Sequence, residues 1–102
     1  MGTNALVDAR NDATVWVSRL RDPDRDARAI AVDTLVAMGA RDSATEIAAL
    51  TADGDALVRA VAARALWALG ASGRADALRT LVDDPDPEVR RVASLALELG
   101  PA

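Results

Sequence analysis

Carboxylate clusters are the most obvious candidates for ligand binding in this sequence. Asp22, Asp24 and Asp26 alternate along the chain, and Asp33 occupies the twelfth position of the segment that Asp22 begins. This is the ligand spacing of a calcium-binding loop, but such a loop needs glycine at its sixth position, where this chain has Ala27. A helix is also predicted to run through the segment. We therefore expect no metal site there, and none at a second cluster, which comprises Asp83, Asp84, Asp86 and Glu88.

The residue types that most often act as catalysts are missing. The 102 residues include no cysteine and no histidine, and all 12 basic residues are arginine. The chain therefore lacks a thiol nucleophile, the commonest general base and a lysine for Schiff-base chemistry. We expect no catalytic residue and no cofactor, and we predict that the protein is not an enzyme.

The charge balance is acidic, with a net charge of −4. An acidic surface lacks the positive field that attracts nucleic acid, so we do not expect DNA or RNA as a partner. The chain has no apolar run long enough to cross a membrane, and its first residues do not form a signal peptide. These features predict a cytoplasmic protein. Arginine without lysine, alongside abundant alanine, is typical of a GC-rich and therefore bacterial genome.

Self-similarity at a fixed spacing organises the chain. When the sequence is offset by 31 residues, three copies align without a gap, at 9–39, 40–70 and 71–101. Such periodicity indicates repeated units that bury their apolar faces against one another. We predict a single domain over 9–101, preceded over residues 1–8 by an extension or by the stub of an earlier helix.

Each copy predicts two helices. The first helices carry Trp16, Ile47 and Leu78 at equivalent positions, so all three side chains are expected in the core. In the second helices an apolar stripe at helical spacing is expected to face the first helix. In the first copy this stripe comprises Ala27, Ile30, Ala31, Thr34, Leu35 and Met38, and Val92 belongs to its counterpart in the third copy.

The ends of the predicted helices carry capping residues. Ser43 begins a Ser-x-x-Glu capping box at the start of the second copy's first helix. Gly39 and Gly70 follow second helices and are expected in the left-handed conformation that ends a helix. An aspartate precedes each second helix and is expected to accept hydrogen bonds from its free amides as the N-cap: Asp24, Asp55 and Asp86.

The turns before the second helices resemble a known signature. Segments 22–28, 53–59 and 84–90 approach the pattern Asp-Pro-x-x-x-Val-Arg, and 58–70 continues it as an alanine-rich helix ending in Leu-Gly. The sequence resembles HEAT repeats, specifically the short phycobilisome-lyase-type HEAT-like repeat. The resemblance implies an all-α fold: a right-handed α-solenoid of three antiparallel helix pairs, about six helices, with the second helices on the concave side.

The resemblance also implies a structural role for the repeated charges. Aspartate and arginine side chains of neighbouring repeats would form a stacked ladder, since arginine suits bidentate pairing in a partly buried site. The residues of this ladder are Asp22, Asp53, Asp84, Arg28, Arg59 and Arg90.

The exposed column of the second helices changes identity from copy to copy, which favours a binding function there. A tryptophan beside an arginine, as at Trp67 and Arg64, is typical of an interaction hot spot, although Trp67 is also suited to packing against neighbouring helices. We predict a non-catalytic protein–protein interaction or scaffold module that binds a peptide or protein on the concave face. Its candidate contacts are Asp33, Val36, Ala60, Arg64, Trp67, Arg91 and Glu98.

Two alternatives stay open, and both come from the resemblance. One is an accessory protein similar to bilin lyases, and the other is a nucleic-acid-binding protein similar to HEAT-like DNA repair glycosylases. Either is compatible with self-association. Leu95 and Leu99 lie where a further repeat or a second copy would dock, and nothing at the ends resembles a polar cap, so a homo-oligomer is predicted.

Overall fold

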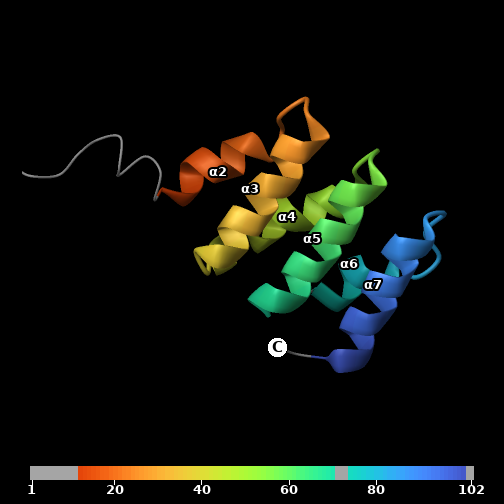
Figure 1. Ribbon diagram of the computed structural model, residues 1–102. Helices are drawn as coiled ribbons and strands as arrows, with labels where there is room; N and C mark the ends of the chain where they lie inside the picture. Colours follow the sequence, from red (N-terminus) through yellow and green to blue (C-terminus); the bar gives the residue numbers. More distant parts are fainter. Residues whose placement is uncertain (1–11, 71–73, 101–102) are drawn as a thin grey trace, which may run out of the picture.

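The computed structural model describes residues 12–70 and 74–100, and this part of the chain is built from helices joined by short turns, with no strand (Figure 1). The predicted extension over residues 1–8 lies outside the described residues. The described elements, in chain order, are α2 (Ala13–Arg19), α3 (Arg25–Ala37), the 3₁₀ helix η1 (Arg41–Ser43), α4 (Ala44–Ala49), the 3₁₀ helix η2 (Leu50–Ala52), α5 (Ala56–Leu69), α6 (Arg74–Arg79) and α7 (Pro87–Leu99).

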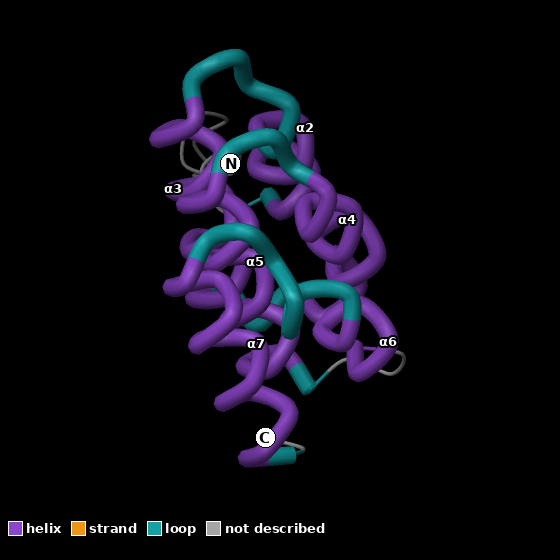
Figure 2. The backbone as a smooth tube through the Cα atoms, turned by 90° about the vertical axis from the view of Figure 1, so that its right-hand side faces the viewer, coloured by secondary structure: helices purple, strands orange, loops and turns teal. Residues whose placement is uncertain are grey.

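The helices form two layers. The second helices α3, α5 and α7 stack side by side, and the shorter first helices α2, α4 and α6 form a second row behind them (Figure 2). Each first helix packs against the second helix that follows it, so the chain consists of three antiparallel pairs. The predicted all-α solenoid is confirmed.

The N-termini of the second helices are fixed by the aspartates that precede them. Asp24, Asp55 and Asp86 occupy the N-cap positions of α3, α5 and α7. The carboxylate of Asp55 accepts a hydrogen bond from the amide of Leu57 at 2.9 Å, and that of Asp86 accepts one from Glu88 at the same distance. Each bond satisfies an amide that the helix itself leaves free.

The other predicted caps had mixed outcomes. Gly39 and Gly70 have positive φ angles of 65° and 61°, a conformation that side chains with a Cβ atom rarely adopt, and the prediction for them is confirmed. The prediction of a capping box at Ser43 is wrong. Ser43 is buried at the end of η1, and its hydroxyl caps no amide of α4, because a 3₁₀ turn leads directly into that helix.

The core consists of two clusters, one on each side of α5. The first joins α3, α4 and α5 around Leu35, Ile47 and Leu66, and the second joins α5, α6 and α7 around Leu78 and Val89. All five side chains are almost fully buried. The helix α5 is therefore covered by neighbours on both sides, and its alanines allow close approach of those helices.

Two residues expected in the core lie partly or largely outside it. Trp16 packs against the first cluster but remains half-buried, with the guanidinium of Arg19 lying 5.4 Å from its ring centroid. Ile30 is 57% exposed. Its equivalent Val61 is buried because α3 covers it, whereas the described part of the chain has no earlier second helix to stack on α3. The burial of this position therefore depends on a neighbouring repeat and not on the helix within the same repeat.

Candidate interaction groove

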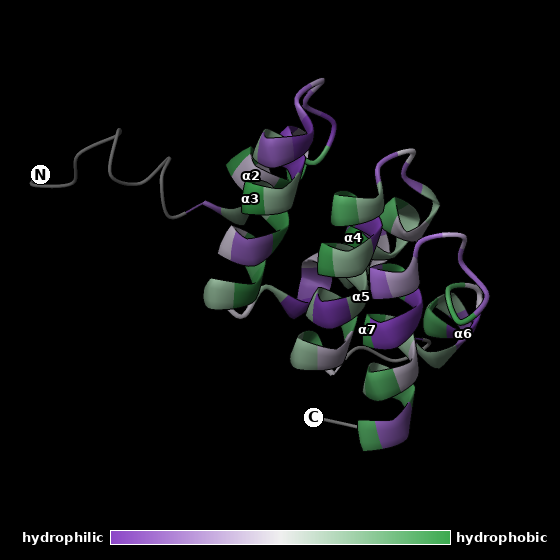
Figure 3. Cartoon of the chain, turned by 45° about the vertical axis from the view of Figure 1, so that its right-hand side comes forward, coloured by the Kyte–Doolittle hydropathy of each residue, from purple (hydrophilic) through white to green (hydrophobic). Residues whose placement is uncertain are grey.

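The turns between first and second helices place the repeated charges along one edge of the stack, where Figure 3 shows strongly hydrophilic residues. Arg28 reaches from the first repeat to Asp53 of the second, and its Nε and Nη2 atoms donate to the two carboxylate oxygens, each at 3.0 Å. Arg59 repeats the contact with Asp84 of the third repeat, at 2.8 and 3.0 Å. Both pairs are bidentate and link consecutive repeats.

The third guanidinium nitrogen of each arginine holds the arginine's own turn. Nη1 of Arg28 donates to the carbonyl of Asp22 at 2.8 Å, and Nη1 of Arg59 donates to that of Asp53 at 2.9 Å. Hydrogen bonds from Arg59 lower the pKa of Asp84 below its ordinary value, although partial burial opposes this shift. The same hydrogen bonds raise the pKa of Arg59. These charges therefore stabilise the stack.

The two ends of the ladder, Asp22 and Arg90, form no ion pair within the described part of the chain. The carboxylate of Asp22 accepts a hydrogen bond from the amide of Asp24 at 2.8 Å, and no arginine of residues 12–70 or 74–100 forms an ion pair with it. Arg90 donates to the carbonyl oxygens of Asp84 and Pro85 and reaches no carboxylate there. The described residues likewise contain no group of three carboxylates placed to hold a metal ion.

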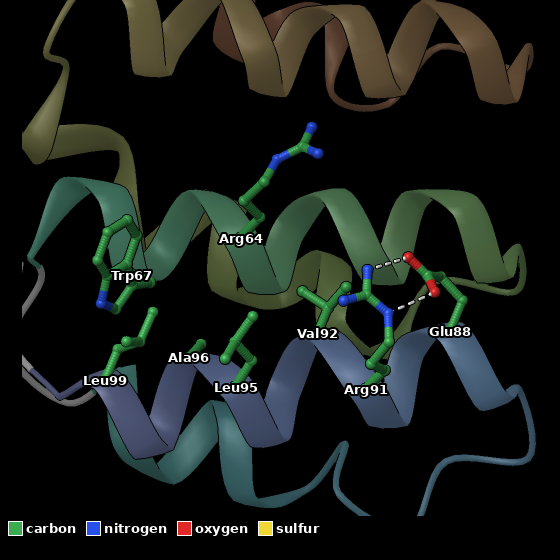
Figure 4. A pocket seen from close by; sticks show the side chains of 8 residues that line it. All are labelled: Arg64, Trp67, Glu88, Arg91, Val92, Leu95, Ala96 and Leu99. Atoms are coloured by element: carbon green, nitrogen blue, oxygen red, sulfur yellow. Dashed lines mark hydrogen bonds and ion pairs between the residues drawn. The ribbon is translucent and has the colours of Figure 1, made fainter.

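A groove of about 260 Å³ runs between α5 and α7, on the side of these helices that faces away from the first helices (Figure 4). Its apolar surface comes from one aromatic residue on α5 and four aliphatic residues on α7. The lining residues are Arg64, Trp67, Glu88, Arg91, Val92, Leu95, Ala96 and Leu99.

Trp67 forms the wall of this groove and also belongs to the packing between α5 and α7. Its ring is half-buried against the second core cluster and lies opposite Leu99 (Figure 4). Its indole Nε1 is buried and donates no hydrogen bond to any described residue. The side chain of Trp67 thus both packs between the two helices and lines the groove. An unsatisfied buried donor is unfavourable, so the ring is held in this position by its apolar contacts.

The corresponding position between α3 and α5 differs in chemistry. There Asp33 and Arg64 form an ion pair at 3.3 Å across the two helices, whereas Leu95 replaces the arginine in α7. Val36 takes the place of Trp67. The apolar lining found between α5 and α7 is therefore not repeated between α3 and α5.

The charged groups around the groove are already paired. Arg91 donates to both carboxylate oxygens of Glu88, at 2.8 and 2.6 Å. These bonds lower the pKa of Glu88 and raise that of Arg91. Arg64 extends away from the groove toward α3, where Asp33 lies (Figure 4). The apolar residues between them are left as the dominant contact surface.

The structure brings together only part of the predicted contact set. Arg64, Trp67 and Arg91 line the groove, and Asp33 is linked to it through Arg64. The remaining three do not line it: Val36 and Ala60 pack partly buried against the core clusters, and Glu98 is exposed.

Most of the contribution of α7 is absent from the predicted contact set. The apolar stripe predicts Val92 against the first helix, but Val92 lines the groove. Leu95 and Leu99, which the sequence places at the end of the stack, line it as well. Their spacing of three and four residues along the helix was the signal that could have placed all three on one face.

Comparison with known proteins agrees with the repeat architecture. The sequence matches the family described as HEAT repeats over residues 13–98. No curated protein matches the chain. No described helix is long and apolar enough to span a lipid bilayer.

Proposed function

Because the chain belongs to the HEAT-repeat family, whose members commonly mediate protein–protein interaction or scaffolding, we propose that it is a non-catalytic module that binds a peptide or helical segment of a partner protein in the groove between α5 and α7. The turn at 84–90, which matches Asp-Pro-x-x-x-Val-Arg in full, and the turns at 22–28 and 53–59, which each depart from it at one position, support the finer assignment to the short phycobilisome-lyase type. The face of the second helices that carries the groove is the binding face in this proposal.

The observation that carries the proposal is the exposure of large apolar side chains beside a tryptophan. Leu95 is 45% exposed and Leu99 is 57% exposed, and both lie next to Trp67 in the groove. Monomeric proteins rarely expose clusters of large apolar side chains, and a cluster with a polar rim usually marks an interaction site. Tryptophan is also among the residues most enriched in binding hot spots.

The dimensions of the groove indicate the kind of segment that fits. From Glu88 to Leu99 the helix α7 rises by about 16 Å, at 1.5 Å for each residue. That length accommodates about three turns of a partner helix, or about five residues of an extended peptide. Because Arg91 and Arg64 are neutralised by their own carboxylates, apolar anchors of the partner would supply most of the affinity.

The proposal can be tested with peptides selected against the full chain from a random twelve-residue library. Affinities of the selected peptides are then measured by isothermal titration for the wild type and for Leu99→Glu. A charge beside Trp67 in the apolar surface should weaken binding at least about tenfold, which corresponds to the loss of 1.4 kcal/mol. The matched control is Ile30→Glu, since Ile30 is as exposed as Leu99 but lies on α3.

Fluorescence gives a second measurement of the same site. The chain has only two tryptophans, so a Trp16→Phe background isolates the emission of Trp67, which should shift when a peptide covers the groove. Peptides that bind Leu99→Glu as tightly as the wild type would contradict the proposal. A bilin and a short DNA duplex are titrated in parallel, and binding of either one in place of peptides would favour the corresponding alternative.

A further inference from the structure

The groove between α5 and α7 contains one polar side chain that has no partner among the described residues. Arg64 is paired with Asp33, and Arg91 is paired with Glu88. The fourth polar side chain of the lining is Trp67, whose Nε1 atom is buried and forms no hydrogen bond. The charges of the groove are therefore neutralised, and the group left for a partner is an uncharged hydrogen-bond donor.

This donor lies at the edge of the groove that can open most easily. In Figure 4 the nitrogen atom of Trp67 is on the side of the ring that faces Leu99. Leu99 is the last residue of α7 and is 57% exposed. Exposed side chains change rotamer within picoseconds to nanoseconds. A change of rotamer at Leu99 therefore uncovers the indole N–H without disturbing the core.

Around Trp67 the lining offers almost no hydrogen-bond acceptor. Glu88 is the only carboxylate of the lining, and it lies about 16 Å along α7 from Leu99. Both of its oxygens already accept hydrogen bonds from Arg91. The α7 side chains nearer to Trp67 are aliphatic. A segment that brought N–H groups into this part of the groove would leave them buried without acceptors, which is unfavourable.

The main chain of a helix does not match these requirements. Its carbonyl groups accept hydrogen bonds from its own amides, apart from those of the last turn. An extended segment leaves its carbonyl groups free, and in polyproline II conformation it has no internal hydrogen bonds. Proline adds an apolar ring and has no N–H, so it presents an acceptor without a donor that must be desolvated. Grooves lined by aromatic residues bind such segments with little loss of conformational entropy.

We propose that the groove takes an extended, proline-containing segment of the partner, and that a main-chain carbonyl of this segment accepts a hydrogen bond from Nε1 of Trp67. The inference rests on the peptide-binding proposal and narrows it to a segment that is not helical. Apolar side chains of the segment contact Leu95 and Leu99. A carboxylate is a poorer acceptor here, because the chain carries a net charge of −4 and the charge would be buried in an apolar groove.

Two libraries of twelve-residue peptides, selected against the full chain, test the conformation of the segment. One fixes proline at every third residue, which is the repeat of polyproline II, and the other has no proline and places leucine at helical spacing. Isothermal titration should show that the best proline peptides bind at least about tenfold more tightly than the best helical ones. Leu99→Glu should weaken the binding of these proline peptides.

Replacing Trp67 with benzothienylalanine tests the hydrogen bond, because this residue has the shape of tryptophan but carries sulfur in place of the N–H. The variant should bind the proline peptides about threefold to tenfold more weakly than the wild type, as expected for one lost hydrogen bond. It should be no less stable, since the N–H has no partner in the free protein. The same replacement at Trp16 should leave the affinity unchanged. In magnetic resonance spectra, the indole proton of Trp67 should move downfield when the peptide binds.

Each part of the proposal has an outcome that would overturn it. Helical peptides that bind more tightly than proline peptides, an affinity unaffected by benzothienylalanine at Trp67, or an indole proton that does not move downfield would each do so. Peptides whose binding depends on an asparagine or glutamine side chain would show that the acceptor is not the main chain. If Leu99→Glu still weakens binding in these cases, the groove remains a peptide site and only this inference fails. If no selected peptide responds to Leu99→Glu, the peptide-binding proposal fails with it.

Discussion

Arg59 and Asp84 lie in different repeats and form two parallel hydrogen bonds, from Nε at 2.8 Å and from Nη2 at 3.0 Å. Their side chains are 15% and 6% exposed, so the pair is largely withdrawn from water. Because Nη1 of the same arginine also donates to the carbonyl of Asp53, one side chain fixes its own turn and the turn of the next repeat. This geometry, repeated by Arg28 and Asp53, sets how consecutive helix pairs stack.

Replacing Arg59 with alanine should destabilise the protein by about 2–3 kcal/mol. The substitution removes both hydrogen bonds to Asp84 and leaves that carboxylate partly buried without its counter-charge, and hydrogen bonds to charged groups contribute about 1.5–3 kcal/mol. Urea denaturation, monitored by circular dichroism, measures the change in the free energy of unfolding.

The chain provides matched controls for this experiment. Arg90→Ala should cost less than Arg59→Ala, because among the described residues Arg90 contacts only two carbonyl oxygens. Arg79→Ala removes an exposed pair with Asp76 and should leave the free energy of unfolding nearly unchanged. Equal losses for Arg59→Ala and Arg90→Ala would show that the contact between repeats contributes little.

Stability should fall in acid through the protonation of Asp84. Arg59 lowers the pKa of Asp84 in the folded protein below the ordinary value of 3.8, so the unfolded chain binds a proton at higher pH than the folded one. The stabilisation is therefore fully present above pH 3.8 and is lost as the pH falls through the folded-state pKa. Denaturation in urea at a series of pH values from about 6 to about 2 should show this decrease.

The variant Asp84→Asn isolates the contribution of this carboxylate. The asparagine side chain cannot titrate, so the free energy of unfolding of this variant should depend less steeply on pH than that of the wild type over the acid range. Part of the slope should remain, because Glu88, whose pKa is lowered by hydrogen bonds from Arg91, is still present. Identical slopes for the two proteins would rule out the assignment to Asp84.

Substituting Gly70 with alanine should destabilise the protein by about 1–2 kcal/mol, the cost of placing a side chain in the left-handed conformation. Gly70 ends α5 with φ at 61°, although open space surrounds the position of the added Cβ atom. The strain is therefore in the backbone and not in packing. Thermal unfolding followed by calorimetry measures the effect.

Gly54→Ala serves as the control for this substitution. Gly54 lies in a turn without a positive φ, and an added Cβ atom meets no neighbour within 4 Å. Its replacement should change the midpoint of thermal unfolding little. A loss as large as that of Gly70→Ala would mean that turn flexibility, and not the left-handed conformation, decides the outcome.

Local chemistry explains why the caps were largely predictable from the sequence. An aspartate before an apolar stripe and a glycine after it act within a few residues, so Asp55 and Gly70 could be placed without knowing the fold. Ser43 is the exception, since the same Ser-x-x-Glu pattern follows a 3₁₀ turn that the sequence does not reveal.

The repeat, its two helices and the ends of most of them can be read from the amino-acid order alone, because helical periodicity and capping depend on residues close together in the chain. Which sides of α3, α5 and α7 are covered depends instead on how the repeats stack in three dimensions. A periodic stripe shows that a helix has an apolar side but not which neighbour covers it. Ile30 and Val61 therefore look equivalent in sequence, yet among residues 12–70 and 74–100 a second helix stacks against Val61 and none stacks against Ile30. The groove beside Trp67 exists only because α7 packs there.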